Sequence, residues 1–77
     1  SMTLADLKPG DRAVIQGWVG DFPPIRLMEY GILPGTEVEL VRFAPLGDPI
    51  DIKIRGYHLS IRKADAALII LTDNHVA

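Results

Sequence analysis

The sequence predicts a mainly β fold, a small and partly open barrel of about five to six short strands with one short inserted helix. Three observations lead to this fold class. Several short runs alternate apolar and polar residues with the two-residue period of a half-buried strand. Pro-Gly pairs and single glycines recur between these runs, where turns are required. One segment has helical spacing instead, and the total of 77 residues favours a single domain over residues 1–77.

The first expected strand, residues 12–20, follows a turn at Pro9-Gly10. Proline presets the first central residue of a type II turn, and glycine accepts the positive φ of the second. Along the strand, Ala13 and Ile15 lie on one face, whereas the polar Gln16 lies on the other. This alternation predicts that the face carrying Ala13 and Ile15 is buried.

The inserted helix is expected over residues 21–31. Two consecutive prolines near its start suit the first turn, where their missing N–H groups cost no hydrogen bond. Ile25, Met28 and Ile32 recur at positions i, i+3 and i+7, which predicts an apolar stripe facing the core. Gly31 suits the left-handed position that ends a helix.

The second half of the chain holds the remaining strands. Alternation of Ile50, Ile52 and Ile54 with charged residues is the clearest strand pattern in the sequence. Further segments are assigned as follows: strands over 37–43, around Leu59 and Ile61, and over 67–72, and one helical turn over 63–66. Five glycines are assigned to turns: Gly10, Gly31, Gly35, Gly47 and Gly56.

The segment from Ala44 to Pro49 is expected to be a stiff connecting loop, because two prolines restrict it and one glycine lets it turn. Before this loop, the buried face of the strand is expected to switch at Val41, as happens where a barrel strand bends. Asp48 and Asp51 are expected to act as a loop cap and a surface charge, and not as a catalytic pair.

Composition narrows the possible functions. The chain has no cysteine, which excludes a disulfide framework and a thiolate metal cluster. Its net charge of −2 disfavours a nucleic-acid partner, because phosphate binding favours a basic excess. The longest apolar run, residues 66–71, is far shorter than the stretch of about 20 residues that crosses a membrane.

The two ends of the sequence suggest further expectations. Ser1 has the form of a residue left by tag cleavage, which makes Met2 the expected natural start. The polar tail 73–77 is expected to be flexible.

The sequence offers little material for catalysis or metal binding. His58 and Ser60 are close in the chain, but no carboxylate is placed to orient the histidine, so we expect two solvent-facing strand residues. His58 and His75 are far apart and belong to no short ligand-spacing motif. We therefore expect no catalytic residue, no metal site and no cofactor.

Several apolar residues in turns and on rims suggest a contact surface for a partner: Trp18, Phe22, Tyr30 and Leu46. A barrel this small needs large side chains for its core, so a core role for the same residues stays open. Four basic residues lie on strands or strand ends: Arg42, Lys53, Arg55 and Arg62. We favour ordinary alternation with acidic cross-strand partners over a basic patch.

Four stretches, in their order and spacing, resemble the FeoA family. They are Leu4-x-x-Leu7-x-Pro9-Gly10, residues 26–38 (RLMEYGILPGTEV), residues 44–50 (APLGDPI) and residues 55–63 (RGYHLSIRK). The likeness covers about residues 3–72 of the chain. Tyr30 departs from the family pattern, which commonly has an aliphatic residue at this position.

The resemblance implies an SH3-like β-barrel that serves as a cytoplasmic accessory of bacterial ferrous iron uptake. It implies a protein without enzymatic activity that binds the membrane transporter FeoB and modulates it. The helix and the 44–49 loop would form the contact surface, with Tyr30, Leu46 and Pro49 as anchors and with Arg55 and Arg62 at a polar rim.

Alternatives stay open beside this interpretation. The same resemblance extends to the C-terminal module of iron-dependent repressors, which suggests a metal-sensing module that binds Fe(II) through His58 and nearby acids. An RNA-binding barrel is a third possibility, although the acidic balance disfavours it. The sequence also leaves a homodimer open.

Overall fold

The computed structural model of the chain describes residues 2–72. Its elements follow in the order η1 (Leu4–Asp6), β1 (Arg12–Trp18), α1 (Ile25–Glu29), β2 (Glu37–Phe43), β3 (Ile50–Ile54), β4 (Tyr57–Ile61), α2 (Lys63–Ala66) and β5 (Ile69–Leu71). The expectations for Ser1 and for the tail 73–77 lie outside the described residues. Over the described part of the chain, no helix combines the length and the apolar composition needed to cross a membrane.

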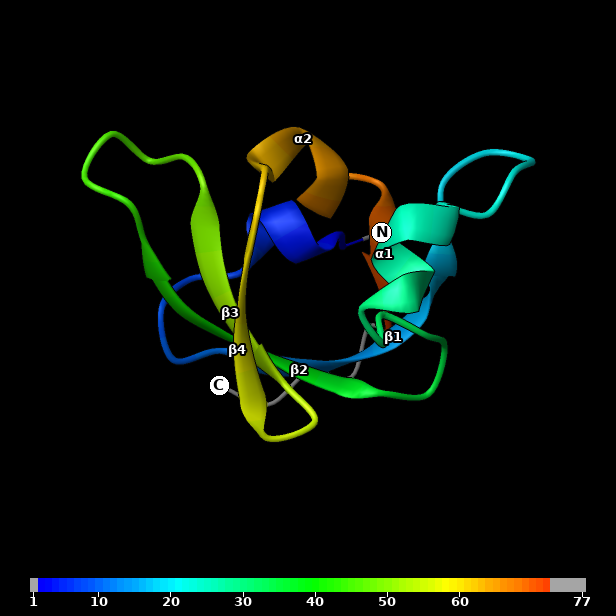
Figure 1. Ribbon diagram of the computed structural model, residues 1–77, viewed down its shortest axis with the longest axis horizontal. Coiled ribbons are helices and arrows are strands. Elements are labelled where there is room, and N and C mark those ends of the chain that lie inside the picture. Colours follow the sequence, from blue (N-terminus) through cyan, green and yellow to red (C-terminus); the bar gives the residue numbers. More distant parts are fainter. Residues whose placement is uncertain (1, 73–77) are drawn as a thin grey trace.

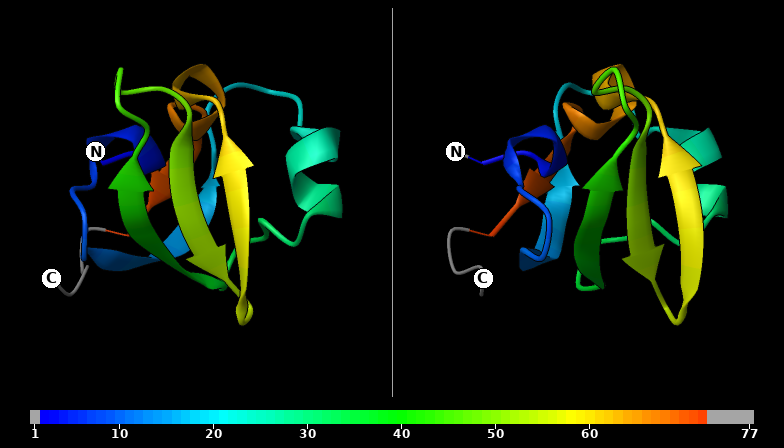
Figure 2. Two further views of the ribbon diagram at one scale, coloured as in Figure 1. Left: turned by 60° about the vertical axis from the view of Figure 1, so that its left-hand side comes forward. Right: turned by 90° about the vertical axis from the view of Figure 1, so that its left-hand side faces the viewer.

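The strands form one antiparallel five-stranded sheet in the order β4-β3-β2-β1-β5. Figure 1 shows the sheet curving around a common interior, with α2 and η1 across one end of it. Figure 2 shows α1 beside β4, outside the sheet. The predicted mainly β barrel with a short inserted helix is therefore confirmed, and β4 and β5 are its two edge strands.

The core follows the alternation of the strands. Ile50, Ile52 and Ile54 are each at most 1% exposed, which confirms the predicted inward face of β3. Ala13 and Ile15 of β1 are buried as well. The remaining core residues come from every other element: Leu4, Leu7, Leu27, Ile32, Val38, Leu40, Ile61, Ala66, Ile69 and Leu71. Within residues 2–72 all buried side chains are apolar, so packing supplies the stability of the interior.

The register explains how the barrel bends. The pairing of β2 with β3 shifts between Leu40 and Arg42, so that the buried face of β2 changes near Val41 as predicted. A second shift lies between Ile15 and Gly17, where β1 passes from its pairing with β2 to its pairing with β5. Such irregularities increase the local twist and help a small sheet to curl.

The predicted helix is wrong in its start and in one residue of its apolar stripe, since Ile32 is buried as predicted and Met28 is half-buried, whereas Ile25 is exposed. α1 begins at Ile25 and not at residue 21, because each of the two consecutive prolines disfavours helical backbone at the residue before it. Ile25 is 58% exposed, and the buried helix residue is Leu27. A helix of five residues has little more than one turn, so only its middle residue, Leu27, is buried.

The end of α1 is a Schellman motif. The backbone N–H of Gly31 donates to Met28 at 2.9 Å, and that of Ile32 donates to Leu27 at 3.2 Å. Leu27 and Ile32 are both buried, which matches the apolar contact that accompanies this motif. All five glycines predicted in turns have positive φ: Gly10, Gly31, Gly35, Gly47 and Gly56.

Candidate functional site

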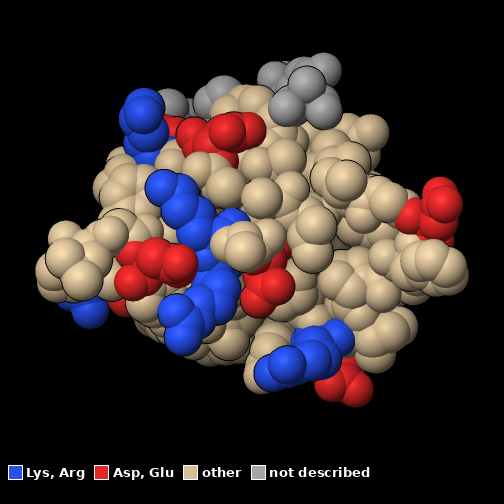
Figure 3. Space-filling view, turned by 90° about the horizontal axis from the view of Figure 1, so that it is seen from above, with Lys and Arg blue, Asp and Glu red and all other residues tan. Residues whose placement is uncertain are grey.

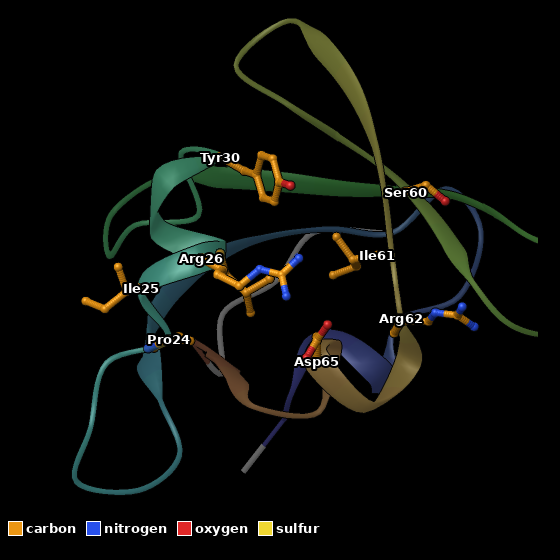
Figure 4. A pocket seen from close by; sticks show the side chains of 9 residues that line it. Pro24, Ile25, Arg26, Tyr30, Ser60, Ile61, Arg62 and Asp65 are labelled. Carbon is orange, nitrogen blue, oxygen red and sulfur yellow. The ribbon is translucent and has the colours of Figure 1, made fainter.

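A groove with a volume of about 620 Å³ separates α1 from the edge strand β4. Its apolar lining consists of Pro24, Ile25, Leu27, Tyr30 and Ile61. Figure 4 shows Tyr30 and Ile61 directed toward the space between the two elements. Leu27 and Ile61 are buried, so they form the floor, while Tyr30 is 45% exposed and forms part of the wall. The groove therefore combines an apolar floor with an aromatic rim.

Charged side chains lie at the α2 end of this groove. Figure 4 shows Arg26 and Asp65 extending into it from opposite sides, whereas Arg62 points away. The salt bridge found within residues 2–72, between Arg42 and Asp51, lies elsewhere. Arg26 and Asp65 thus face the groove without an ionic partner in the described part of the protein. A ligand in the groove would meet one positive and one negative group beside an apolar surface.

The wall formed by α1 is held at its C-terminal end by the β3–β4 turn. The hydroxyl of Tyr57 donates a hydrogen bond to the backbone carbonyl of Tyr30. A Cβ atom at Gly31 would lie 3.3 Å from the Cδ of Arg55 and 3.3 Å from the Tyr57 hydroxyl oxygen. The hydrogen bond, together with the close approach of Gly31 to both side chains, fixes the end of the helix against β4, so the groove between them is preformed.

A second groove, with a volume of about 550 Å³, lies on the other side of β4. Its lining consists of Arg42, Phe43, Ala44, Pro45, Pro49, Asp51 and Ser60. Because Ser60 lines both grooves, the edge strand lies between them. The two grooves and β4 can therefore contribute to one continuous contact surface.

The loop over residues 44–49 has internal support. The backbone N–H of Ala44 donates to the carbonyl of Pro49 at 3.0 Å, and that of Gly47 donates to Ala44 at 2.7 Å. The Asp48 carboxylate accepts a hydrogen bond from the backbone N–H of Lys63 at 3.0 Å, at the start of α2. Asp48 was expected to cap its own loop, but this bond instead connects the loop to the start of α2.

Replacing Asp48 by Ala should lower the free energy of unfolding by about 0.5–1.5 kcal/mol, the usual net value of one hydrogen bond. The Lys63 N–H would lose its acceptor, and the loop would lose its contact with α2. Urea unfolding followed by circular dichroism measures the change. Asp21→Ala is the matched control, because this exposed carboxylate makes no hydrogen bond within residues 2–72. Equal stability of the two variants would contradict the assigned role.

The five predicted contact residues fall into separate parts of this surface. Tyr30 and Arg62 line the first groove, and Pro49 lines the second. Leu46 is 97% exposed in the 44–49 loop. Arg55 has a φ of 53° in the β3–β4 turn and lies beside Gly31, close to Tyr30. The structure thus distributes these residues around β4 and does not gather them at one point.

Sequence reasoning missed several groove residues, namely Arg26, Ile25, Ile61 and Asp65. Ile25 was expected to be buried. The two prolines before Ile25 shorten the helix. They are the sequence signal that could have predicted an exposed Ile25 at the helix start. Of the other apolar candidates, Phe22 is 85% exposed in the loop before α1, and Trp18 is only partly exposed.

The charges on the surface are mixed. Arg42 pairs with Asp51 across β2 and β3, with 3.0 Å between Nε and Oδ2, and Lys53 lies opposite Glu39. Figure 3 shows Lys and Arg next to Asp and Glu on the face that carries α2. The expected cross-strand alternation is therefore observed for these pairs.

Metal-ligating side chains do not gather in the described chain. Within residues 2–72, no group of three His, Cys, Asp or Glu side chains is placed to hold a metal ion. His58 and Ser60 are exposed on β4, as expected for solvent-facing strand residues. His75 lies outside the described residues.

Comparisons with known proteins identify relatives of the chain. The model of the FeoA domain family matches residues 2–73. A Fe(2+) transport protein A/Fe(2+) transporter FeoB fusion protein of Porphyromonas gingivalis (strain ATCC BAA-308 / W83) is 39% identical over 69 residues. This alignment covers 88% of the chain but only 8% of the fusion protein, so the chain corresponds to a small part of that relative.

Solved structures share the fold. The solution structure of FeoA from Chlorobium tepidum has a TM-score of 0.80 and 38% identity, over 91% of this chain and 68% of that one. The crystal structure of Stenotrophomonas maltophilia FeoA in complex with zinc, described as a prokaryotic SH3 domain protein, has a TM-score of 0.78 and 26% identity. The match covers 94% of this chain and 91% of the Stenotrophomonas maltophilia chain. Together with the family match over nearly all of its length, these likenesses show that the chain belongs to the FeoA domain family.

Proposed function

We propose that this chain is a non-enzymatic accessory protein of ferrous iron uptake that docks on the cytoplasmic part of a FeoB-type membrane transporter and modulates it. The observation that carries the proposal is the preformed groove between α1 and β4, which has an apolar floor, the exposed Tyr30 and unpaired charges. The fusion of the two proteins in Porphyromonas gingivalis supports the choice of partner, because fused domains work at high effective concentration.

The proposed contact surface is centred on β4. Tyr30 is its aromatic anchor, and Arg55 and Arg62 are its polar rim. Pro49 and Leu46 extend the surface through the second groove and the loop. Aromatic and Arg side chains are enriched among residues that dominate binding energy, and a fully exposed leucine gains most from being covered.

Modulation then follows from differential affinity. A protein without catalytic groups changes the activity of a transporter only if it binds one conformation more tightly than another. A tenfold preference corresponds to about 1.4 kcal/mol, which one well-packed anchor supplies. The rigid attachment of α1 to the β3–β4 turn suits this role, because a preformed surface loses little entropy on binding.

Isothermal titration calorimetry with the purified cytoplasmic part of the FeoB-type transporter from the same organism tests the proposal. We expect Tyr30→Ala to raise the Kd at least about tenfold, because an anchor side chain is lost. The hydrogen bond from Tyr57 is retained in this variant, since its acceptor is the backbone carbonyl.

Val19→Ala is the matched control, because Val19 is 48% exposed but lines neither groove. It should leave the Kd within about twofold of the original value, as surface substitutions usually do. Absence of binding by the unmodified protein at high micromolar concentration, with and without guanine nucleotide, would refute the proposed function.

A further inference from the structure

The free edge of β4 presents unpaired backbone groups. Arg55 and Gly56 form a two-residue turn with positive φ at both positions, and Ile54 pairs with Tyr57 across it. In such a hairpin the residues that flank the turn form a hydrogen-bonded pair, and hydrogen-bonded and non-bonded pairs then alternate. The backbone N–H and C=O groups of His58 and Ser60 therefore point away from β3.

Nothing in the described chain satisfies these groups. β4 has one strand neighbour, β3, and no backbone hydrogen bond from His58 or Ser60 to another element occurs within residues 2–72. Both residues are exposed. An edge of this kind is a template for pairing with another extended chain.

The first groove runs along this edge. Ser60 lines it, yet Figure 4 shows the Ser60 side chain directed away from α1, so the groove meets the backbone side of the strand. α1 forms the opposite wall. An extended segment in the groove would hydrogen-bond to β4 on one side and contact the α1 side chains on the other.

The spacing of side chains on α1 matches that of an extended chain. Arg26 and Tyr30 are one helical turn apart, which corresponds to about 6 Å along the helix axis. Alternate residues on one face of a strand are about 6.6 Å apart. A segment that places an apolar side chain against Tyr30 can thus place an acidic one against Arg26, which has no ionic partner in the described residues.

We propose that the groove binds an extended peptide segment of the transporter partner by β-strand addition to β4. The segment pairs with the backbone of His58 and Ser60 and carries an acidic and an apolar side chain two residues apart, for Arg26 and Tyr30. This proposal rests on the proposed function. A second copy of the chain fits the groove less well. A β4 strand that paired with the β4 of the first copy would have to lie against α1.

Proline scanning of the free edge separates backbone pairing from side-chain contact. Ser60→Pro removes an outward N–H and leaves the pairing of β4 with β3 intact, because proline is tolerated on the free side of an edge strand. Ser60→Ala removes the same hydroxyl but keeps the N–H. With the cytoplasmic part of the transporter as probe, we expect Ser60→Pro to raise the Kd at least about tenfold and Ser60→Ala to change it less than about twofold.

The charge of Arg26 gives an independent test. Arg26→Gln should weaken binding by about fivefold to tenfold and reduce the salt dependence of the Kd, since a charge-assisted hydrogen bond is lost. Lys8→Gln changes the net charge equally but lies in the turn before β1, away from the groove, and should have no such effect.

Hydrogen exchange of the unmodified protein keeps the proposal testable if Ser60→Pro does not fold. On adding the probe, the amides of His58 and Ser60 should become protected, whereas that of Leu59 already bonds to β3 and should change little.

Binding with equal Kd for Ser60→Pro and Ser60→Ala, or binding without this protection of the amides, would overturn strand addition and leave the docking proposal standing. Concentration-dependent dimerisation that Ser60→Pro abolishes would assign the edge to a second copy and overturn it too. A probe that does not bind at all refutes the proposed function itself.

Discussion

Ile52→Ala is expected to lower the free energy of unfolding by about 2–5 kcal/mol, the range found for removing a buried aliphatic side chain. Ile52 is 0% exposed and is the middle residue of β3, between Leu40 of β2 and Leu59 of β4. The cavity cannot collapse easily, because strands on both sides hold the backbone in register. A single core in a chain of this size supplies only about 3–5 kcal/mol of stability, so this loss removes a large part or all of it.

Urea unfolding followed by circular dichroism checks this expectation. Ile52→Val should cost about 0.5–1.5 kcal/mol, because it removes only one methyl group. Leu46→Ala removes a similar side chain at a position that is 97% exposed, and it should change stability by less than about 0.5 kcal/mol. If Ile52→Ala were no less stable than Leu46→Ala, the assignment of Ile52 to the core would be wrong.

The strands were predictable because their pattern is local. Alternation of Ile50, Ile52 and Ile54 with charged residues allows only one face of the strand to be buried, whatever the neighbouring strands are.

The helix was less predictable than the strands. Its apolar residues fit a longer stripe, but the prolines before Ile25 shorten it, and the Schellman motif at Gly31 decides that Leu27 is buried.

The site was less predictable than the fold, because it depends on which segments become neighbours. The family resemblance suggested Tyr30 as an anchor and Arg62 at the rim, and both line the first groove, although the Arg62 side chain points away from it. The contribution of Arg26 depends on the position of α1 beside β4, which no local pattern encodes. The outward backbone groups of His58 and Ser60 likewise depend on β4 being an edge strand, and this follows only from the complete strand order.

Gly31→Ala is expected to destabilise the protein and to alter the groove, although Gly31 does not line it. Its φ of 95° is unfavourable for any residue with a Cβ atom, which costs about 1–2 kcal/mol. The new Cβ would also lie 3.3 Å from both the Arg55 Cδ and the Tyr57 hydroxyl oxygen, closer than an ordinary contact. Since these side chains hold the end of α1 against the β3–β4 turn, relief of the contact should displace the helix.

Gly35→Ala separates the two contributions. Gly35 has a similar φ of 89°, but a Cβ atom there would meet nothing within 4 Å, so this variant reports backbone strain alone. We expect Gly31→Ala to cost about 1 kcal/mol more than Gly35→Ala, a typical penalty for inserting a methyl group into a packed site. Only Gly31→Ala should shift the NMR signals of Tyr30 and Ile61.

A double-mutant cycle with Tyr57→Phe tests the same contact. Tyr57→Phe removes one of the two close atoms, so the additional cost of Gly31→Ala should shrink in that background. Equal costs for the two glycine variants, with no change at Tyr30, would mean that the β3–β4 turn does not position α1 and that the groove is not preformed.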